Sequence, residues 1–333
     1  MVKRFLFIFA LIIFGSQITY SQDPEFSQFY ANRLYLNPAF AGEVICPRVA
    51  MNYRNQWPAL GSTYVTYSAS YDQYVDFLQG GIGFHVFRDV QGDGAITSTY
   101  ASLMYAYTFP VNRNFSVKAA LQYSVYQRRL AWDFVFPSMI HPLYGVIYPD
   151  TEYDTQMEEY LGDFNVNKWL DVSAGMLGFS KDYYFGIAVH HLTQPTESFR
   201  ENSDAVLPAK WTGHFGTNIP ITGRNLKKGE LFISPNILYQ QQMNFQQLNY
   251  GIYANRKNFV VGVWLRQNFN FHYDSFIVLL GFSHDKIKTA YSYDLTISQL
   301  RNQTLGAHEV SVIYQFPCPE KKKKFRQISC PSF

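Results

Sequence analysis

The sequence is poor in charged residues and in long apolar runs. Only 16% of its 333 residues are charged, whereas a soluble domain carries about a quarter. The mean hydropathy is nevertheless −0.17, which excludes a bundle of transmembrane helices because such proteins are far more apolar. The formal net charge of +3 is too small to indicate a nucleic-acid partner. This balance is typical of a barrel whose polar interior offsets a lipid-facing exterior.

The sequence also lacks the residue patterns of common catalytic and metal sites. It contains no HExxH, P-loop, Ser-His-Asp or paired-cysteine zinc pattern. His190 and His191 are adjacent, so in a strand they would face opposite sides, one in the lumen and one near a membrane interface. An acidic stretch at 150–163 could hold calcium, but its spacing does not match an EF-hand and a solvated loop is the simpler interpretation. We therefore expect no enzyme activity, no cofactor and no bound metal.

Cysteine is scarce, and the sequence leaves its pairing open. The chain has three cysteines, a number that suits an oxidising compartment. Cys318 and Cys330 flank a basic stretch and could form a disulfide, which would leave Cys46 over. With three cysteines, no pairing follows from the sequence alone.

The N-terminal residues indicate export from the cytoplasm. Lys3 and Arg4 give a positive start, an apolar core follows, and Thr19 and Ser21 form a small-residue cleavage site, so residues 1–21 are predicted to be a signal peptide. The apolar core runs for about ten residues, too few for a transmembrane helix. We expect the mature chain to be either a secreted soluble protein or an outer-membrane barrel.

Most of the mature chain consists of short stretches in which apolar and polar residues alternate, as where Val263 and Leu265 alternate with Gly262, Arg266 and Asn268. Period-two alternation predicts strands with one apolar and one polar face. We expect an all-β fold, a transmembrane antiparallel barrel of about 14 strands. The predicted strands are Val49–Trp57, Thr63–Gln73, Gly80–Arg88, Ile96–Phe109, Asn114–Arg128, Trp169–Ser180, Tyr183–Leu192, Ala209–Pro220, Glu230–Gln241, Asn244–Asn255, Asn258–Phe269, His272–Asp285, Ile287–Gln299 and Gly306–Phe316.

The charged residues set the direction in which the strands face. In Asn114–Arg128, Leu121 and Tyr123 share the apolar face, and Lys118 and Gln122 share the other. A Lys or Arg facing lipid at mid-bilayer costs about 2–4 kcal/mol, so the polar faces are predicted to line the lumen. The alternative is a soluble β-sandwich, but its strands usually run about 5–6 residues, shorter than these.

Loop lengths predict the orientation in the membrane. The connections Arg129–Lys168 and Thr193–Pro208 are long and fall at the same end of the barrel, whereas Lys181-Asp182 at the other end is a tight turn. Long external loops and short periplasmic turns are the expected asymmetry. The long loops are therefore predicted to be external and the N-terminus periplasmic.

Two segments flank the predicted barrel at 48–316. Residues 22–47 contain Asp23-Pro24-Glu25, a helix-start pattern, followed by Phe26, Phe29, Tyr30 and Leu34, which could form the stripe of a short helix. This segment is predicted to plug the lumen, close its periplasmic mouth, or pack beneath the barrel. Residues 317–333 form a basic periplasmic tail. Its candidate contacts to a periplasmic partner are Lys321, Lys322, Lys323, Lys324 and Arg326; a solvated tail is the alternative.

Several groups of residues resemble the PorP/SprF family of type IX secretion outer-membrane proteins. They occur in the family's order and span the mature chain. They are Asp23-Pro24-Glu25-Phe26-Ser27-Gln28-Phe29-Tyr30, Leu36-Asn37-Pro38-Ala39-Phe40-Ala41-Gly42, Tyr53-Arg54-Asn55-Gln56-Trp57, Gln194-Pro195, Leu207-Pro208, His214, Ala290-Tyr291-Ser292-Tyr293-Asp294 and Gly306-Ala307-His308-Glu309-Val310-Ser311.

The resemblance implies a protein of the cell outer membrane that assists secretion or surface anchoring of a large cargo, often a gliding adhesin, by holding the cargo's C-terminal domain. The implied partners are that domain, other type IX secretion components and outer-membrane lipid. The resemblance carries no catalytic residues. Aromatic side chains in the long loop are candidate cargo contacts, namely Trp132, Phe134, Phe136 and Tyr144, although they could instead pack the loop on itself. The alternative function is a porin-like channel for small solutes, biased toward anions by Lys118, Arg128 and Arg266.

Overall fold

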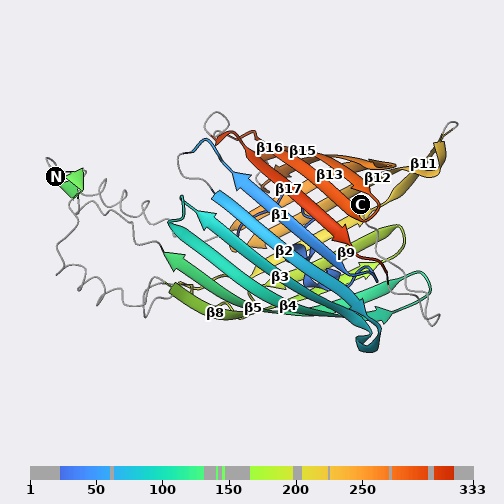
Figure 1. Ribbon diagram of the computed structural model, residues 1–333, viewed down its shortest axis with the longest axis horizontal. Coiled ribbons are helices and arrows are strands. Elements are labelled where there is room, and N and C mark those ends of the chain that lie inside the picture. The colour runs from blue at the N-terminus through green and yellow to red at the C-terminus, as the bar shows by residue number, and fades with distance from the viewer. Residues whose placement is uncertain are drawn as a thin grey trace, which may run out of the picture.

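The chain folds into a closed antiparallel β-barrel (Figure 1). The computed structural model describes residues 23–60, 64–130, 140–141, 145–146, 166–197, 205–223, 226–269, 272–298 and 304–318. Neighbouring strands pair around the wall, β1 pairs with β17, and β10 pairs with β12 to complete the ring. Because β10 and β11 are successive parts of one strand that both pair with β12, the wall has 14 strands. The predicted fold class is confirmed.

The observed strands agree with the predicted ones to within a few residues. The described residues contain no helix that is both long and apolar enough to cross a membrane. The wall strands are β1 Arg48–Gln56, β2 Tyr64–Val75, β3 Gly80–Gln91, β4 Ile96–Pro110, β5 Ser116–Leu130, β8 Val166–Phe179, β9 Tyr183–His190, β10 Lys210–Thr217, β11 Ile219–Gly223, β12 Leu226–Gln242, β13 Phe245–Arg256, β14 Phe259–Gln267, β15 Tyr273–His284, β16 Ile287–Thr296 and β17 Ala307–Gln315. The short elements are α2 Arg33–Leu36, η1 Pro38–Phe40, η2 Asp76–Leu78, β6 Ile140–His141 and β7 Gly145–Val146.

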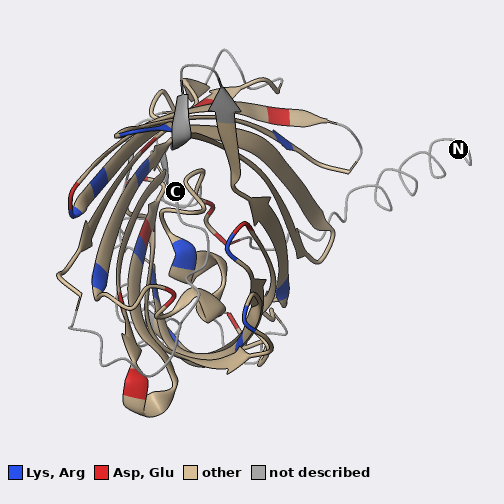
Figure 2. Ribbon diagram, turned by 90° about the vertical axis from the view of Figure 1, so that its right-hand side faces the viewer, with Lys and Arg blue, Asp and Glu red and all other residues tan. Residues whose placement is uncertain are grey.

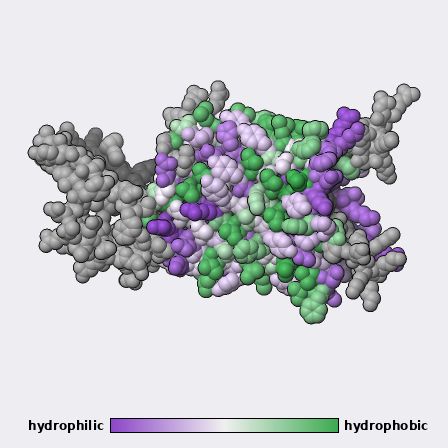
Figure 3. Space-filling model, in the orientation of Figure 1, coloured by the Kyte–Doolittle hydropathy of each residue, from purple (hydrophilic) through white to green (hydrophobic). Residues whose placement is uncertain are grey.

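Side chains along the wall alternate between an apolar exterior and a polar interior. On β5, Leu121 is 64% exposed on the outer face, whereas Lys118 and Gln122 are buried on the inner face. On β14 the outward Phe259 is likewise 64% exposed and the inward Trp264 is buried. Figure 3 shows hydrophobic side chains over the strand region of one outer face and hydrophilic ones toward its ends. The predicted facing of the strands, with polar side chains toward the lumen and apolar side chains outward, is confirmed.

The segment Asp23–Pro47, which we call the lumen segment, runs through the inside of the barrel (Figure 2). Asp23 contacts Gln242 at the end of the barrel where β5 and β9 finish, the long-loop end. The segment leaves the lumen at the opposite, short-turn end and continues into β1. Its side chains supply much of the buried core between segment and wall: Phe29, Tyr30, Leu34, Leu36, Ala39, Phe40 and Ala41.

The helix expected over residues 26–34 does not form, since the described helix covers only Arg33–Leu36. The aromatic side chains of the segment instead contact different parts of the wall. Phe26 packs against Phe87 of β3, and Phe29 packs against Trp264 of β14. A single helical stripe faces only one side. Irregular backbone is therefore what lets the segment contact the surrounding wall on several sides.

Candidate functional site in the barrel lumen

Glycines in the wall let the lumen segment approach the strands. Gly42 has a left-handed backbone with φ +58°, and a Cβ placed there would overlap the Cα of Gly81 on β3. A Cβ at Gly81 would in turn overlap the carbonyl oxygen of Ala41, and one at Gly175 on β8 would overlap the side-chain oxygen of Asn37. At Gly81 the backbone of the segment touches the backbone of the wall, and at Gly175 the Asn37 side chain touches it; a side chain at either glycine would keep the segment away.

Two arginines and two carboxylates meet one serine of the lumen segment. We call this set, Ser27, Arg54, Arg266, Asp294 and Glu309, the arginine cluster; all of it is buried. Arg54 lies 3.0 Å from Asp294 and 3.2 Å from Glu309, and Arg266 lies 3.4 Å from Asp294. The Ser27 hydroxyl donates to Asp294 at 2.5 Å and accepts from Arg54 at 2.7 Å and Arg266 at 3.0 Å. Since buried charge is costly unless it is paired, the cluster fixes the segment to the wall.

The same part of the wall also binds the segment's backbone. The Ser27 and Gln28 amides donate to the two Glu309 carboxylate oxygens at 2.6 and 3.2 Å. The Gln28 side chain donates to Ser292 at 3.1 Å and accepts from Ser311 at 2.5 Å. The Glu309 carboxylate thus satisfies two backbone amides of the segment that no described strand of the wall pairs with.

A second ionic contact holds the segment at the short-turn end. Arg33 and Glu43, both of the segment, form an ion pair, and Arg48 of β1 lies 3.8 Å from Glu43. Arg48 also contacts Asp72 of β2 at 2.8 Å, and Asp72 accepts the Gly42 amide at 3.1 Å. Arg48 therefore links the lumen segment, through Glu43, to β2, through Asp72, at the point where the segment continues into β1.

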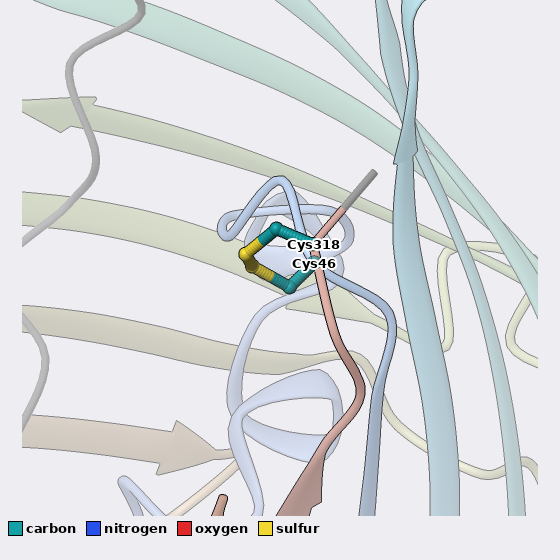
Figure 4. The surroundings of a disulfide bond; sticks show 2 residues. All are labelled: Cys46 and Cys318. Carbon is teal, nitrogen blue, oxygen red and sulfur yellow. A yellow bond between two sulfur atoms is a disulfide. The ribbon is translucent and has the colours of Figure 1, made fainter. Parts of the chain in front are cut away.

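The disulfide lies at this same end. It joins Cys46, just before β1, to Cys318, just after β17, with Cα atoms 4.4 Å apart (Figure 4). The suggested Cys318–Cys330 bond is therefore wrong for Cys318. The reason is the barrel closure: β1 pairs with β17, so residues 272 positions apart in sequence become neighbours.

A third contact lies at the long-loop end, and we call it the Asp23 clasp. His191 lies 3.0 Å from Asp23 and 2.9 Å from Asp171 of β8, and Lys210 lies 3.5 Å from Asp23. His191 follows β9 and has φ +58°, so the backbone turns there. Both His190 and His191 are consequently buried against the lumen segment. The expectation that one of them lies near a membrane interface is wrong.

The clasp predicts a pH dependence. Burial alone would lower the pKa of His191, but the carboxylates of Asp23 and Asp171 outweigh it and raise the pKa to about 9. A histidine whose pKa is raised on folding contributes stability that is complete below about pH 6.5 and is lost as the pH rises through about 9. As the pH is raised from 6.5 to 9.5, we expect the free energy of unfolding to decrease by on the order of 3 kcal/mol. The midpoint of urea unfolding should shift to a lower urea concentration accordingly.

His191→Gln should remove most of that pH dependence, as judged by the unfolding midpoint at the two pH values. His284→Gln is the matched control, because the His284 side chain is 67% exposed. An unchanged pH dependence in His191→Gln would show that the clasp does not carry it.

The lumen contacts bring together the residues that carry the family resemblance. Arg54 comes from the first-strand group, Asp294 and Glu309 from the closing groups, and Ser27 from the opening group. His214 likewise meets Asn37 at 3.1 Å. The sequence analysis did not predict this site. The available signal was that Arg54 and Glu309 both fall on the polar, lumen-facing side of their strands.

The predicted contact residues lie outside the described part of the chain. These are the loop aromatics Trp132, Phe134, Phe136 and Tyr144 and the basic residues Lys321, Lys322, Lys323, Lys324 and Arg326. The predicted signal peptide and the acidic stretch at 150–163 lie outside it as well.

Comparison with solved structures finds other barrels. The Ralstonia pickettii toluene transporter TbuX aligns with TM-score 0.47 and 9% identity over 85% of this chain and 92% of that one. The Acinetobacter baumannii outer membrane protein Omp33 aligns with TM-score 0.43 and 7% identity, covering 82% and 99%. KdgM porin, solved with disordered oligogalacturonate, aligns with TM-score 0.37 and 9% identity, covering 80% and 99%. No curated protein sequence matches.

A family model matches residues 18–314, nearly the whole chain, and its description is "Type IX secretion system membrane protein PorP/SprF". The match includes the lumen segment and thirteen complete wall strands together with almost all of β17. With the apolar exterior of the barrel, it places the protein in the outer membrane. The chain belongs to the PorP/SprF family of type IX secretion system membrane proteins.

Proposed function

We propose that the protein assists secretion or surface anchoring of a large cognate cargo, such as a gliding adhesin, without catalysing a reaction. Its partners would be the cargo's C-terminal domain and other type IX components. The observation that carries this proposal is the lumen segment, bound to the wall by the arginine cluster, the Asp23 clasp and the disulfide. A barrel filled in this way suits a docking platform better than an open pore.

The porin-like alternative is less well supported. Its three lumen cations already have partners: Lys118 donates to the Ala41 carbonyl oxygen at 2.5 Å, Arg128 pairs with Glu197, and Arg266 contacts Asp294. An anion-selective pore needs cations that face an aqueous path. We expect the wild-type protein in planar bilayers to show little conductance.

The cargo is proposed to bind at the long-loop end, through the aromatic residues of the connection between β5 and β8. Arg129 pairs with Val166 across the two strands. Residues 131–165 can therefore be replaced by a short Gly-Ser turn while the strand register is kept. We expect this variant to assemble in the outer membrane and to lose most of its cargo.

The measurement is affinity purification of detergent-solubilised protein followed by mass spectrometry. Recovery of a large secreted protein through its C-terminal domain, from wild type but not from the 131–165 variant, supports the proposal. Undiminished cargo recovery from that variant rejects the loop as the contact. Recovery of only porin-like assemblies from wild type argues against the cargo role altogether. Heat-modifiable mobility on SDS gels checks that the variant barrel is folded.

A further inference from the structure

The turn between β2 and β3 carries the most exposed large apolar side chain of the described residues. The turn consists of η2 and Gln79, and its Phe77 is 92% exposed. Outward side chains on the described strands reach at most 64%, as at Leu103. In Figures 1 and 2 the turn stands out beyond the ring of strands at the short-turn end. An apolar group this exposed indicates a surface that a partner covers.

Hydrogen bonds hold this turn against the outer face of the wall. The Tyr105 hydroxyl of β4 donates to the Leu78 carbonyl oxygen at 2.7 Å. The Tyr107 hydroxyl, from the same strand, donates to the Gln79 side-chain oxygen at 2.9 Å. Within the turn, the Gln79 amide donates to the Asp76 carbonyl oxygen at 3.2 Å. Because these polar groups have partners within the protein, their removal from water costs little.

The turn continues the lipid-facing surface of β4. Tyr107 and Phe109 are neighbours on the outer face of that strand, with ring centroids 4.5 Å apart. Phe109 is exposed, and so is Val111, just beyond the end of β4. We call Phe77, Leu78, Phe109 and Val111 the turn patch. Since the patch is continuous with the face of the barrel that contacts lipid, the membrane is the partner that it fits.

Charged residues indicate how deep the turn patch lies. Asp76 directly precedes Phe77, Arg113 lies in the same turn as Val111, and both charged side chains are exposed. Charge is costly at the middle of a bilayer but is tolerated near its surface. The patch therefore fits the boundary between acyl chains and head groups, where the long Arg113 side chain can reach a lipid phosphate.

Other turns at the short-turn end have a different character. Lys181-Asp182, Arg256-Lys257 and Asp285-Lys286 consist of exposed charged residues, which suit water. The Arg256-Lys257 turn joins β13 to β14, about half-way around the ring from the turn between β2 and β3. The apolar outer surface thus extends past the strand ends on one side of the barrel and ends with the strands on the other.

We propose that the turn patch inserts into the membrane leaflet at the short-turn end, with its apolar side chains below the head groups and Arg113 at the lipid phosphates. The turn between β2 and β3 is thereby drawn into the membrane while the turn between β13 and β14 stays in water. The barrel axis is consequently tilted from the membrane normal. The proposal does not depend on the cargo role, because it rests on the outer face alone.

The test measures the depth of spin labels on the full-length protein in phospholipid nanodiscs. The background is Cys330→Ser, in which Cys46 and Cys318 remain joined by the disulfide. Collisions of a label with oxygen, which concentrates in lipid, and with a water-soluble nickel chelate report its depth. Single labels are attached in Phe77→Cys, Val111→Cys, Leu121→Cys and Lys257→Cys.

We expect the labels at Phe77→Cys and Val111→Cys to lie about 5–10 Å into the boundary between head groups and acyl chains, the depth that interfacial apolar side chains reach. The Lys257→Cys label, on the opposite side of the ring, should lie in water. Leu121→Cys is the lipid reference, because Leu121 is on the outer face of β5.

A second arm tests whether the patch itself sets the depth. Phe77→Ser/Leu78→Ser should move the Val111→Cys label toward water, whereas Phe77→Leu, which keeps an apolar side chain, should not. Heat-modifiable mobility on SDS gels shows that each variant is folded.

The proposal is overturned if the Phe77→Cys label meets the nickel chelate as often as the Lys257→Cys label does. It is also overturned if the Phe77→Cys label is shielded from both reagents, as contact with a second protein copy would cause. A Val111→Cys label that keeps its depth in Phe77→Ser/Leu78→Ser would likewise reject it.

Discussion

Replacing Arg54 with methionine is expected to destabilise the protein by about 3–5 kcal/mol, the usual cost of removing one partner from a buried ion pair. Arg54 is 2% exposed and is the cation that contacts both Asp294 and Glu309. Without it, Glu309 stays buried beside the Ser27 amide with no described cation in contact. The lumen segment should loosen, so urea unfolding should shift to lower concentration and bilayer conductance should rise.

Two controls separate the ion pairs from a general loss of packing. Arg256→Met removes an exposed arginine at the short-turn end and should leave both readouts unchanged. Arg54→Met combined with Glu309→Gln removes the carboxylate left without a described cation, keeps Asp294 in contact with Arg266, and should recover much of the stability. Wild-type stability and conductance in Arg54→Met alone would contradict the role given to the arginine cluster.

Removing the disulfide is expected to have an effect of similar size. In Cys46→Ser/Cys318→Ser the covalent link between residues 272 positions apart is lost, and the unfolded chain gains conformational freedom. Loss of a native disulfide typically costs about 2–5 kcal/mol. The temperature at which the folded band disappears on non-reducing SDS gels should fall accordingly, and reductant should reproduce the effect in wild type.

The control for this variant is Cys330→Ser. If Cys46 pairs with Cys318, then Cys330→Ser leaves the transition temperature as in wild type. A lowered temperature in Cys330→Ser, together with a Cys318–Cys330 peptide in the mass spectrum, would instead contradict the observed pairing.

Much of the fold could be predicted because strand formation and facing are local properties. Alternation along Asn114–Arg128 and Asn258–Phe269 was sufficient to locate β5 and β14 and to turn Lys118 and Arg266 inward. The two adjacent histidines were the exception. The positive φ at His191 turns its side chain to the same side as that of His190. Neither neighbouring residue is of a type that predicts such a turn.

The candidate site could not be predicted because its members are distant in sequence. Ser27 meets Glu309 across 282 positions, and no periodicity specifies which inward side chains share one level of the lumen. Motif resemblance identified these residues as a group without showing that they touch. Their contact depends on barrel closure through β1 and β17.

The sequence by itself determined the strands, their register, the inward direction of the charges and the membrane, because each follows from period-two alternation and the cost of placing charge in lipid. Only the tertiary structure decided what fills the lumen, which cysteines pair and which charges neutralise one another. The physical reason is that closing a barrel joins the two ends of the chain, and buried charges then have to find partners among residues that closure brings together.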